Sequence, residues 1–166
     1  MEHTIVVRPA LKEDLGAITE IYNDAILTTT ATFDTEPKTE AWQLGWFQSH
    51  GGRFALLVAD REGLVVGWAS LSMWSDRPAY DDTAETSVYV RREFRGQGIG
   101  RMLEAALIEQ ARRSRFHTLI ARIAGESTVS LRLHESLGYV RIGTMKEVGR
   151  KFGRVLDVHM LQKMLE

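Results

Sequence analysis

Short apolar runs and longer amphipathic segments alternate along this chain. Consecutive or alternating apolar residues predict strands at residues 5–7, 54–59, 64–73, 83–90, 117–123, 139–144 and 155–161. Apolar residues spaced three and four apart predict helices at residues 12–26, 39–49, 98–114 and 127–137. Hairpin turns join some of these strands and helices join others. This order predicts one mixed α/β domain of the α+β type over residues 1–166.

Two of the predicted helices carry an apolar stripe. For helix 98–114 we expect a buried face made of Ile99, Met102, Leu103, Ala106 and Leu107. For helix 127–137 the apolar residues are Val129, Leu133 and Leu137, and Gly138 is placed to end the helix. Between the first two helices, residues 28–37 are rich in threonine and are expected to be non-helical.

Composition and charge exclude several classes of protein. The 166 residues carry a net charge of −1, which gives no general electrostatic attraction for nucleic acid. The chain has no cysteine, so disulfides, thiolate metal sites and a cysteine nucleophile are excluded, and no metal is expected. No apolar run approaches the roughly 20 residues of a membrane helix. A cytoplasmic protein without a membrane partner is the expectation.

The segment Arg95-Gly96-Gln97-Gly98-Ile99-Gly100 lies between a predicted strand and a predicted helix. Glycines at a helix start let free backbone N–H groups approach an anion, which the helix dipole also favours. Arg101 and Met102 stand where a Walker A loop has Lys and Ser or Thr, and Arg101 replaces the last glycine of a dinucleotide fingerprint. Two interpretations of this segment remain open. Either it binds a phosphate-bearing ligand of another kind, or it is a glycine loop that binds no ligand.

The spacing Arg95-x-x-Gly98-x-Gly100 resembles the pyrophosphate loop of the GNAT superfamily of N-acetyltransferases. The resemblance implies a GNAT-like domain, with a central, mixed, mostly antiparallel sheet flanked by helices. It implies acetyl-CoA as co-substrate, with its pyrophosphate on the backbone of Arg95, Gly96, Gln97, Gly98, Ile99, Gly100 and Arg101. It also implies that Val88, Tyr89 and Val90 pair with the pantetheine arm like an added strand.

Further segments resemble one branch, the phosphinothricin acetyltransferase family with its methionine sulfoximine and methionine sulfone relatives. They are Ile21-Tyr22-Asn23, Thr30-Ala31-Thr32-Phe33, Arg77-Pro78-Ala79-Tyr80, residues 85–90, Leu133-His134-Glu135, Leu137-Gly138-Tyr139 and Val148-Gly149-x-Lys151-x-Gly153. This resemblance covers nearly the whole chain. It implies acetylation of the α-amine of a small amino-acid analogue, a role in detoxification or in antibiotic or herbicide resistance, and a homodimer.

Two residues are candidates for acid–base chemistry. Glu85 is a single carboxylate inside an otherwise uncharged strand, and by the resemblance it is the base that deprotonates the amine, directly or through a water molecule. By itself it also fits a solvated glutamate on a half-exposed strand. His134 lies where this branch has a histidine, and the resemblance implies a proton donor to the thiolate or a partner in a proton relay.

The remaining candidates concern binding. An arginine fork suits a carboxylate or phosphinate, and Arg77 with Tyr80 matches family positions that contact the acceptor. Phe33 and Trp74 are expected to form an apolar wall or part of the core. Ser127 and Ser130 match coenzyme-contacting positions, although the family usually has Asn at the first. Val155 replaces a family tryptophan, which leaves the acceptor or the dimer packing open.

Other functions stay open on sequence alone. The acceptor amine can instead be a polyamine, an aminoglycoside or a protein N-terminus. A third class is a non-catalytic acyl-CoA-binding module, which the presence of both Glu85 and His134 disfavours. Neither nucleic acid nor a membrane is expected as a partner.

Overall fold

The computed structural model describes residues 3–166. The strands are β1 (Ile5–Pro9), β2 (Leu56–Arg61), β3 (Leu64–Met73), β4 (Thr83–Val90), β5 (Thr118–Ala124), β6 (Val140–Lys151) and β7 (Arg154–Met164). The helices are α1 (Leu15–Thr28), α2 (Glu40–Gln48), α3 (Ile99–Arg113) and α4 (Thr128–Ser136). Short 3-10 turns lie at η1 (Lys12–Asp14), η2 (Pro78–Tyr80) and η3 (Arg92–Phe94).

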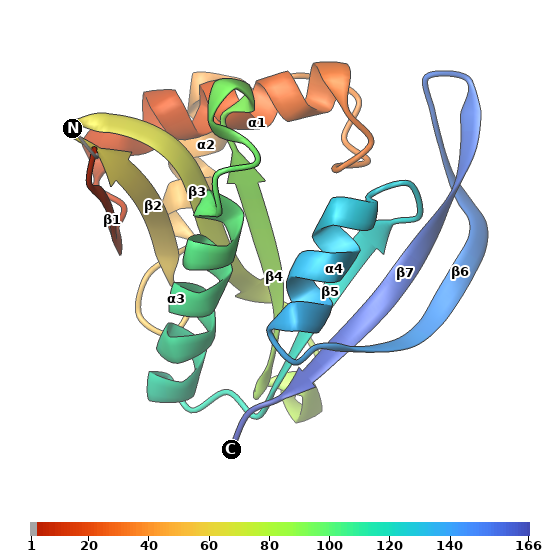
Figure 1. Ribbon diagram of the computed structural model, residues 1–166. Helices are drawn as coiled ribbons and strands as arrows, with labels where there is room; N and C mark the ends of the chain where they lie inside the picture. The colour runs from red at the N-terminus through yellow and green to blue at the C-terminus, as the bar shows by residue number, and fades with distance from the viewer. Residues whose placement is uncertain (1–2) are drawn as a thin grey trace.

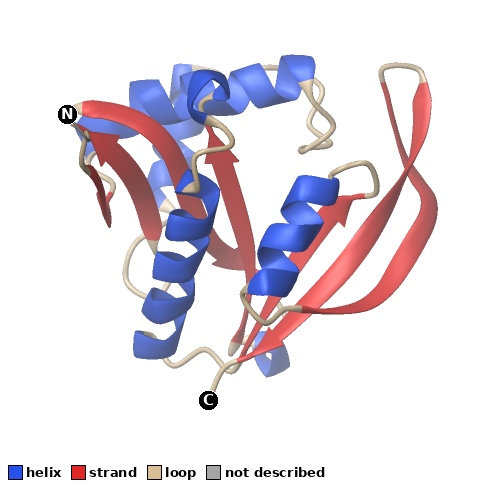
Figure 2. Ribbon diagram, in the orientation of Figure 1, coloured by secondary structure: helices blue, strands red, loops and turns tan. Residues whose placement is uncertain are grey.

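The strands form one seven-stranded sheet in the order β1-β2-β3-β4-β5-β7-β6. Every neighbouring pair is antiparallel except β4 with β5, which is parallel. Helices flank this sheet, with α3 and α4 in front of it in the view of Figure 2. The expected mixed, mostly antiparallel sheet flanked by helices is therefore confirmed. Within residues 3–166, no helix is both long and apolar enough to cross a membrane.

The inner strands are buried on both faces, which explains their continuous apolar runs. On β2, Leu56 and Val58 pack with Ile18 and Ile21 of α1. The alternate residues of the same strand, beginning with Leu57, belong to the larger core beneath α3. The two cores therefore lie on opposite faces of one sheet, because successive side chains of a strand point to opposite sides.

The sheet opens between β4 and β5, and this opening positions the candidate site. The two strands pair only over Thr83–Glu85, with Glu85 opposite Ile120 as the last pair. Beyond that point β4 continues to Val90, whereas β5 turns away along β7 to Ala124. Figure 1 shows the two strands diverging, with α3 and α4 in front of them. The backbone of β4 thus has one edge that β5 does not cover.

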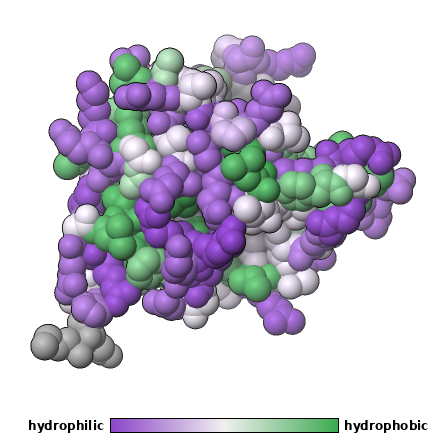
Figure 3. Space-filling view, turned by 90° about the horizontal axis from the view of Figure 1, so that it is seen from above, coloured by the Kyte–Doolittle hydropathy of each residue, from purple (hydrophilic) through white to green (hydrophobic). Residues whose placement is uncertain are grey.

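The C-terminal hairpin is longer than the sequence predicted. We expected strands at 139–144 and 155–161, but β6 reaches Lys151 and β7 begins at Arg154. Most of β6 is exposed, so its sequence lacks the alternation that marks a half-buried strand. Pairing with β7 holds it instead, with register shifts before Gly143 and Gly149. In Figure 3 the space-filling surface shows an arm that extends to the right, the side on which Figure 1 draws this hairpin.

Two expected buried residues are exposed. Met102 is 40% exposed on α3, while Ile99, Leu103 and Leu107 are buried as predicted. Val129 is 79% exposed at the start of α4, where Leu131 and His134 form the buried face instead. Apolar spacing alone therefore does not decide which side of the first turn of a helix meets the core.

Candidate active site

A cleft of about 520 Å³ occupies the opening between β4 and β5. Its walls come from the threonine-rich segment, β4, β5, α4 and the β6–β7 hairpin. They include Phe33, Glu85, Val88, Tyr89, Arg122, Ser127, Ser130, His134 and Met145. The structure therefore brings the two candidates for acid–base chemistry, Glu85 and His134, into one cleft with Phe33, Ser127 and Ser130, from segments far apart in the chain.

The glycine segment forms the entrance to α3. Gly96 and Gly98 have φ of 75° and 81°, in the left-handed region that favours glycine, and Gly98 caps the helix. The backbone N–H of Met102 bonds to the carbonyl of Gly98 over 3.1 Å, which leaves the earlier N–H groups of the first turn without intrahelical acceptors. A β-carbon on Gly100 would lie 3.1 Å from Leu133 of α4. This geometry fits a bound pyrophosphate.

Glu85 lies on β4 at the point where the sheet opens. Its side chain is only 17% exposed. Both of its carboxylate oxygens accept hydrogen bonds from Arg122 of β5, from Nε over 2.7 Å and from Nη2 over 2.8 Å. Glu85 is therefore held as one half of a bidentate ion pair rather than standing alone as the sequence suggested.

His134 is buried on α4, with an exposed fraction of 6%. Its Nδ1 lies 2.8 Å from the carbonyl oxygen of Ser130, an acceptor that requires the proton on Nδ1. Its Nε2 faces Oε2 of Glu104 at 3.9 Å. The ring of Tyr139 meets the imidazole edge-on, with centroids 5.0 Å apart. His134 thus connects the cleft to a buried acidic group on α3.

That acidic group, Glu104, is fully buried. The hydroxyl of Tyr139 donates a hydrogen bond to Oε1 of Glu104 over 2.5 Å. Burial raises the pKa of Glu104 above its ordinary value of 4.5, and this effect outweighs the opposing influence of His134 and Tyr139. Burial also raises the pKa of Tyr139.

The threonine-rich segment forms a wall of the cleft and is fixed by polar contacts. The hydroxyl of Tyr22 donates to Asp34 and lies 3.1 Å from Oγ1 of Thr32. Lys151, buried near the end of β6, donates from Nζ to the carbonyl of Thr32 over 2.8 Å. Burial lowers the pKa of this lysine. These bonds join α1 and the hairpin through the segment that carries Phe33.

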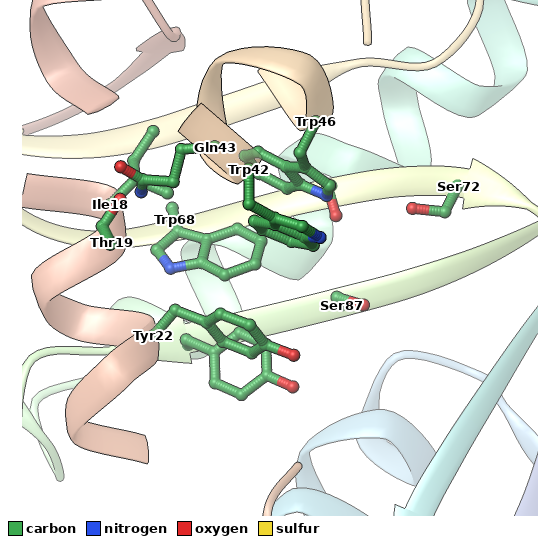
Figure 4. Close-up of a pocket in the computed structure, with 11 residues that line it drawn as sticks. Ile18, Thr19, Tyr22, Trp42, Gln43, Trp46, Trp68, Ser72 and Ser87 are labelled. Atoms are coloured by element: carbon green, nitrogen blue, oxygen red, sulfur yellow. The ribbon is translucent and has the colours of Figure 1, made fainter. Parts of the chain in front are cut away.

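A second, smaller cavity of about 90 Å³ lies beside the cleft (Figure 4). Its lining comes from α1, α2 and the sheet and includes five aromatic residues: Tyr22, Trp42, Trp46, Trp68 and Tyr89. Tyr22, Ser87 and Tyr89 line both spaces. Burial raises the pKa of Tyr89 to about 12, so its hydroxyl stays protonated at neutral pH. The cleft thus shares one wall with a smaller recess lined by aromatic rings and hydroxyl groups.

The other acceptor candidates lie farther out. The Trp74 ring lies beside Arg122, 5.7 Å from Cζ to the ring centroid. Arg77 and Tyr80 belong to the exposed turn at η2 and are not among the cleft walls, so their acceptor role stays a prediction. Ser127 caps α4 and lines the cleft with Ser130. Their contact with the coenzyme also remains a prediction.

Two residues of this site escaped the sequence reasoning. Glu104 had a detectable signal, because it shares a helix face with Gly100, Leu107 and Ile108, where a charged residue is unusual. The signal for Arg122 was weaker: it is the single charged residue within the buried strand β5. Nothing in the sequence pairs it with Glu85, since the contact depends on where the two strands diverge.

Comparison with known proteins agrees with this geometry. The model of the acetyltransferase (GNAT) family matches residues 18–139. An L-methionine sulfoximine/L-methionine sulfone acetyltransferase of Salmonella typhimurium is 38% identical over 163 residues, which cover 98% of this chain and 95% of the relative. A phosphinothricin N-acetyltransferase of Streptomyces coelicolor is 40% identical over 165 residues, covering 97% and 96%.

A solved structure gives the same result at the level of the fold. The structure of yncA from Salmonella typhimurium, solved with its cofactor acetyl-CoA, superposes with a TM-score of 0.95 at 38% identity. The match covers 98% of this chain and 94% of the other. The chain belongs to the GNAT family of acetyltransferases, whose members use acetyl-CoA. Within that family, its relatives include the phosphinothricin and methionine sulfoximine acetyltransferases.

Proposed function

We propose that this protein transfers the acetyl group of acetyl-CoA to the α-amine of a small amino-acid analogue of the phosphinothricin, methionine sulfoximine or methionine sulfone type. The observation that carries this proposal is the ion pair of Glu85 and Arg122 inside the cleft. It presents one anionic and one cationic group side by side, as an amino-acid zwitterion requires. The names of the relatives support the same acceptor class.

Different residues of the cleft bind the coenzyme and transfer protons. Bound acetyl-CoA supplies an activated acetyl group as its thioester. The N–H groups at the start of α3 hold the pyrophosphate, and the uncovered edge of β4 at Val88, Tyr89 and Val90 lies along the pantetheine. Glu85 takes the proton of the substrate ammonium, which makes the amine a nucleophile. The imidazolium form of His134 gives the proton of Nε2 to the departing thiolate and keeps the Nδ1 proton that the carbonyl of Ser130 accepts.

An acetyl-CoA thiol-release assay over an acceptor panel tests this function. Phosphinothricin, methionine sulfoximine and methionine sulfone should react, and they should have higher kcat/KM than a polyamine, an aminoglycoside or a peptide N-terminus. The proposal fails if these three analogues are inert while another amine reacts. Binding of acetyl-CoA without turnover of any acceptor would instead favour a non-catalytic module.

We also propose that two copies of this chain form a homodimer in the cytoplasm. The β6–β7 hairpin carries apolar side chains that are unusually exposed for a single chain: Val140, Ile142, Val148, Phe152 and Val155. Val155 stands where the family has tryptophan, so a second copy would meet a smaller side chain there. Analytical ultracentrifugation should give twice the chain mass, and an Ile142→Glu variant should shift it toward the monomer. A monomeric wild-type protein contradicts the proposal.

A further inference from the structure

The guanidinium of Arg122 forms a bidentate ion pair with the carboxylate of Glu85 inside the cleft. Arg122 lies on β5 two residues beyond Ile120, where the pairing of β4 with β5 ends. Its Nε and Nη2 donate to both oxygens of Glu85, over 2.7 and 2.8 Å. Because both oxygens already accept N–H groups of a permanent cation, a substrate ammonium that reaches Glu85 competes with the guanidinium for the same carboxylate.

The two members of this pair differ in their freedom to move. The side chain of Arg122 is 52% exposed and lines the cleft, whereas that of Glu85 is 17% exposed. The ring of Trp74 lies beside the guanidinium and offers it an aromatic surface. Arg122 is therefore the partner that can turn toward an incoming ligand, while Glu85 stays in place on its strand.

We propose that Arg122 binds the carboxylate of the acceptor and that the pair of Arg122 with Glu85 selects α-amino acids over amines without an acid group. This inference rests on the function proposed above and specifies the part of the acceptor that is recognised. An α-amino acid carries an ammonium for Glu85 and a carboxylate for Arg122, so each member of the pair gains an oppositely charged group of the acceptor. An amine without an acid group competes with Arg122 for Glu85 and offers the guanidinium no anion in return.

The charges around the cleft favour Arg122 for this role. Among the cleft-lining residues of the described chain, it carries the one permanent positive charge. Two nearby lysines are already engaged, because Lys38 pairs with Asp34 at 3.4 Å and Lys151 is buried against the carbonyl of Thr32. An acid group that enters beside Glu85 therefore meets the guanidinium of Arg122.

A pair of matched acceptors tests this inference. One is methionine sulfoximine, and the other is the same amine with hydrogen in place of the carboxylate. Wild-type protein should prefer the amino acid in kcat/KM, and R122Q should reduce that preference by about ten-fold or more, mainly through KM. R122K should keep part of the preference, because lysine retains the charge without the fork. The KM for acetyl-CoA should not change.

Arg154→Gln is the matched control. Arg154 is 53% exposed and pairs with Glu126 at 2.7 Å, but it is not among the residues that line the cleft. R154Q should keep the wild-type preference. If R122Q keeps it as well, Arg122 does not recognise the carboxylate, although the proposed function stands. If wild-type protein acetylates no amino-acid analogue, the proposed function and this inference both fail.

Discussion

The phenyl ring of Phe33 lies in the space that a side chain at position 149 would need. A β-carbon on Gly149 would overlap three atoms of that ring. Gly149 lies on β6, at the end of its irregular stretch, and Phe33 lies in the threonine-rich wall of the cleft. The hydrogen bond from Lys151 to Thr32 joins the same two segments. The hairpin thus sets the position of one wall of the candidate active site.

Gly149→Ala should push Phe33 out of its place. Overpacking of this kind costs about 1–3 kcal/mol, so the melting temperature should fall and the KM for the acceptor should rise. Thermal unfolding and steady-state kinetics measure the two effects. Gly143→Ala on the same strand is the control, because a β-carbon there meets nothing within 4 Å. Equal KM and stability in the two variants would show that Phe33 moves aside without consequence.

Glu85→Gln should remove the base while keeping the size of the side chain. We expect kcat to fall by about 100-fold or more, which is the usual contribution of a general base. Acetyl-CoA should bind as before, since its proposed contacts lie on β4 beyond Glu85 and at α3. Glu126→Gln, which removes the exposed partner of Arg154, should leave kcat unchanged. A Glu85→Gln enzyme with wild-type kcat would assign the proton transfer to another group.

Gly98→Ala should weaken binding of the coenzyme. The φ of 81° at this helix cap costs a residue with a β-carbon about 1–2 kcal/mol, and relief of that strain would move the N–H groups of the loop. The KM for acetyl-CoA should therefore rise, with a lower melting temperature. Gly16→Ala in α1 meets nothing within 4 Å and should stabilise the protein by up to ~1 kcal/mol. An unchanged KM for acetyl-CoA in Gly98→Ala would argue against a pyrophosphate at this loop.

Glu104 should make the stability of the fold depend on pH. Its pKa is raised in the folded state, so folding favours the protonated form. The free energy of unfolding should then fall as the pH rises from 4.5, the ordinary pKa of this carboxyl group, through its raised pKa in the folded protein. Glu104→Gln has no proton to lose and keeps a carbonyl oxygen for Tyr139. Its stability relative to wild type should increase with pH.

Urea unfolding at about pH 5 and about pH 8 measures this difference. Glu109→Gln is the control on the same helix, because Glu109 is 58% exposed and pairs with Arg112, three residues along the helix. It should change stability equally at both pH values. Parallel behaviour of Glu104→Gln and wild type would mean that Glu104 is not protonated preferentially in the folded protein.

The chain order of helices and strands followed from the sequence, because each element has its own local pattern of apolar and polar residues. The β4 strand at 83–90 and the glycine turn before α3 lie where the pattern predicted them. The predicted extent of the C-terminal hairpin was wrong, because the pattern there is weak. The outer half of β6 has no buried face, so its apolar spacing carries no signal, and pairing with β7 keeps it extended.

The sequence by itself determined the order of the elements, the glycine turn at Gly96–Gly100 before α3 and the presence of a carboxylate in β4. The tertiary structure decided the partners. It placed Arg122 on Glu85, because β4 and β5 separate just after Ile120 and leave both side chains facing one cleft. It also placed Glu104 beneath His134, because α3 and α4 pack on the same side of the sheet. Periodicity reports which face of an element is buried, whereas contacts between distant segments depend on the register and divergence of strands.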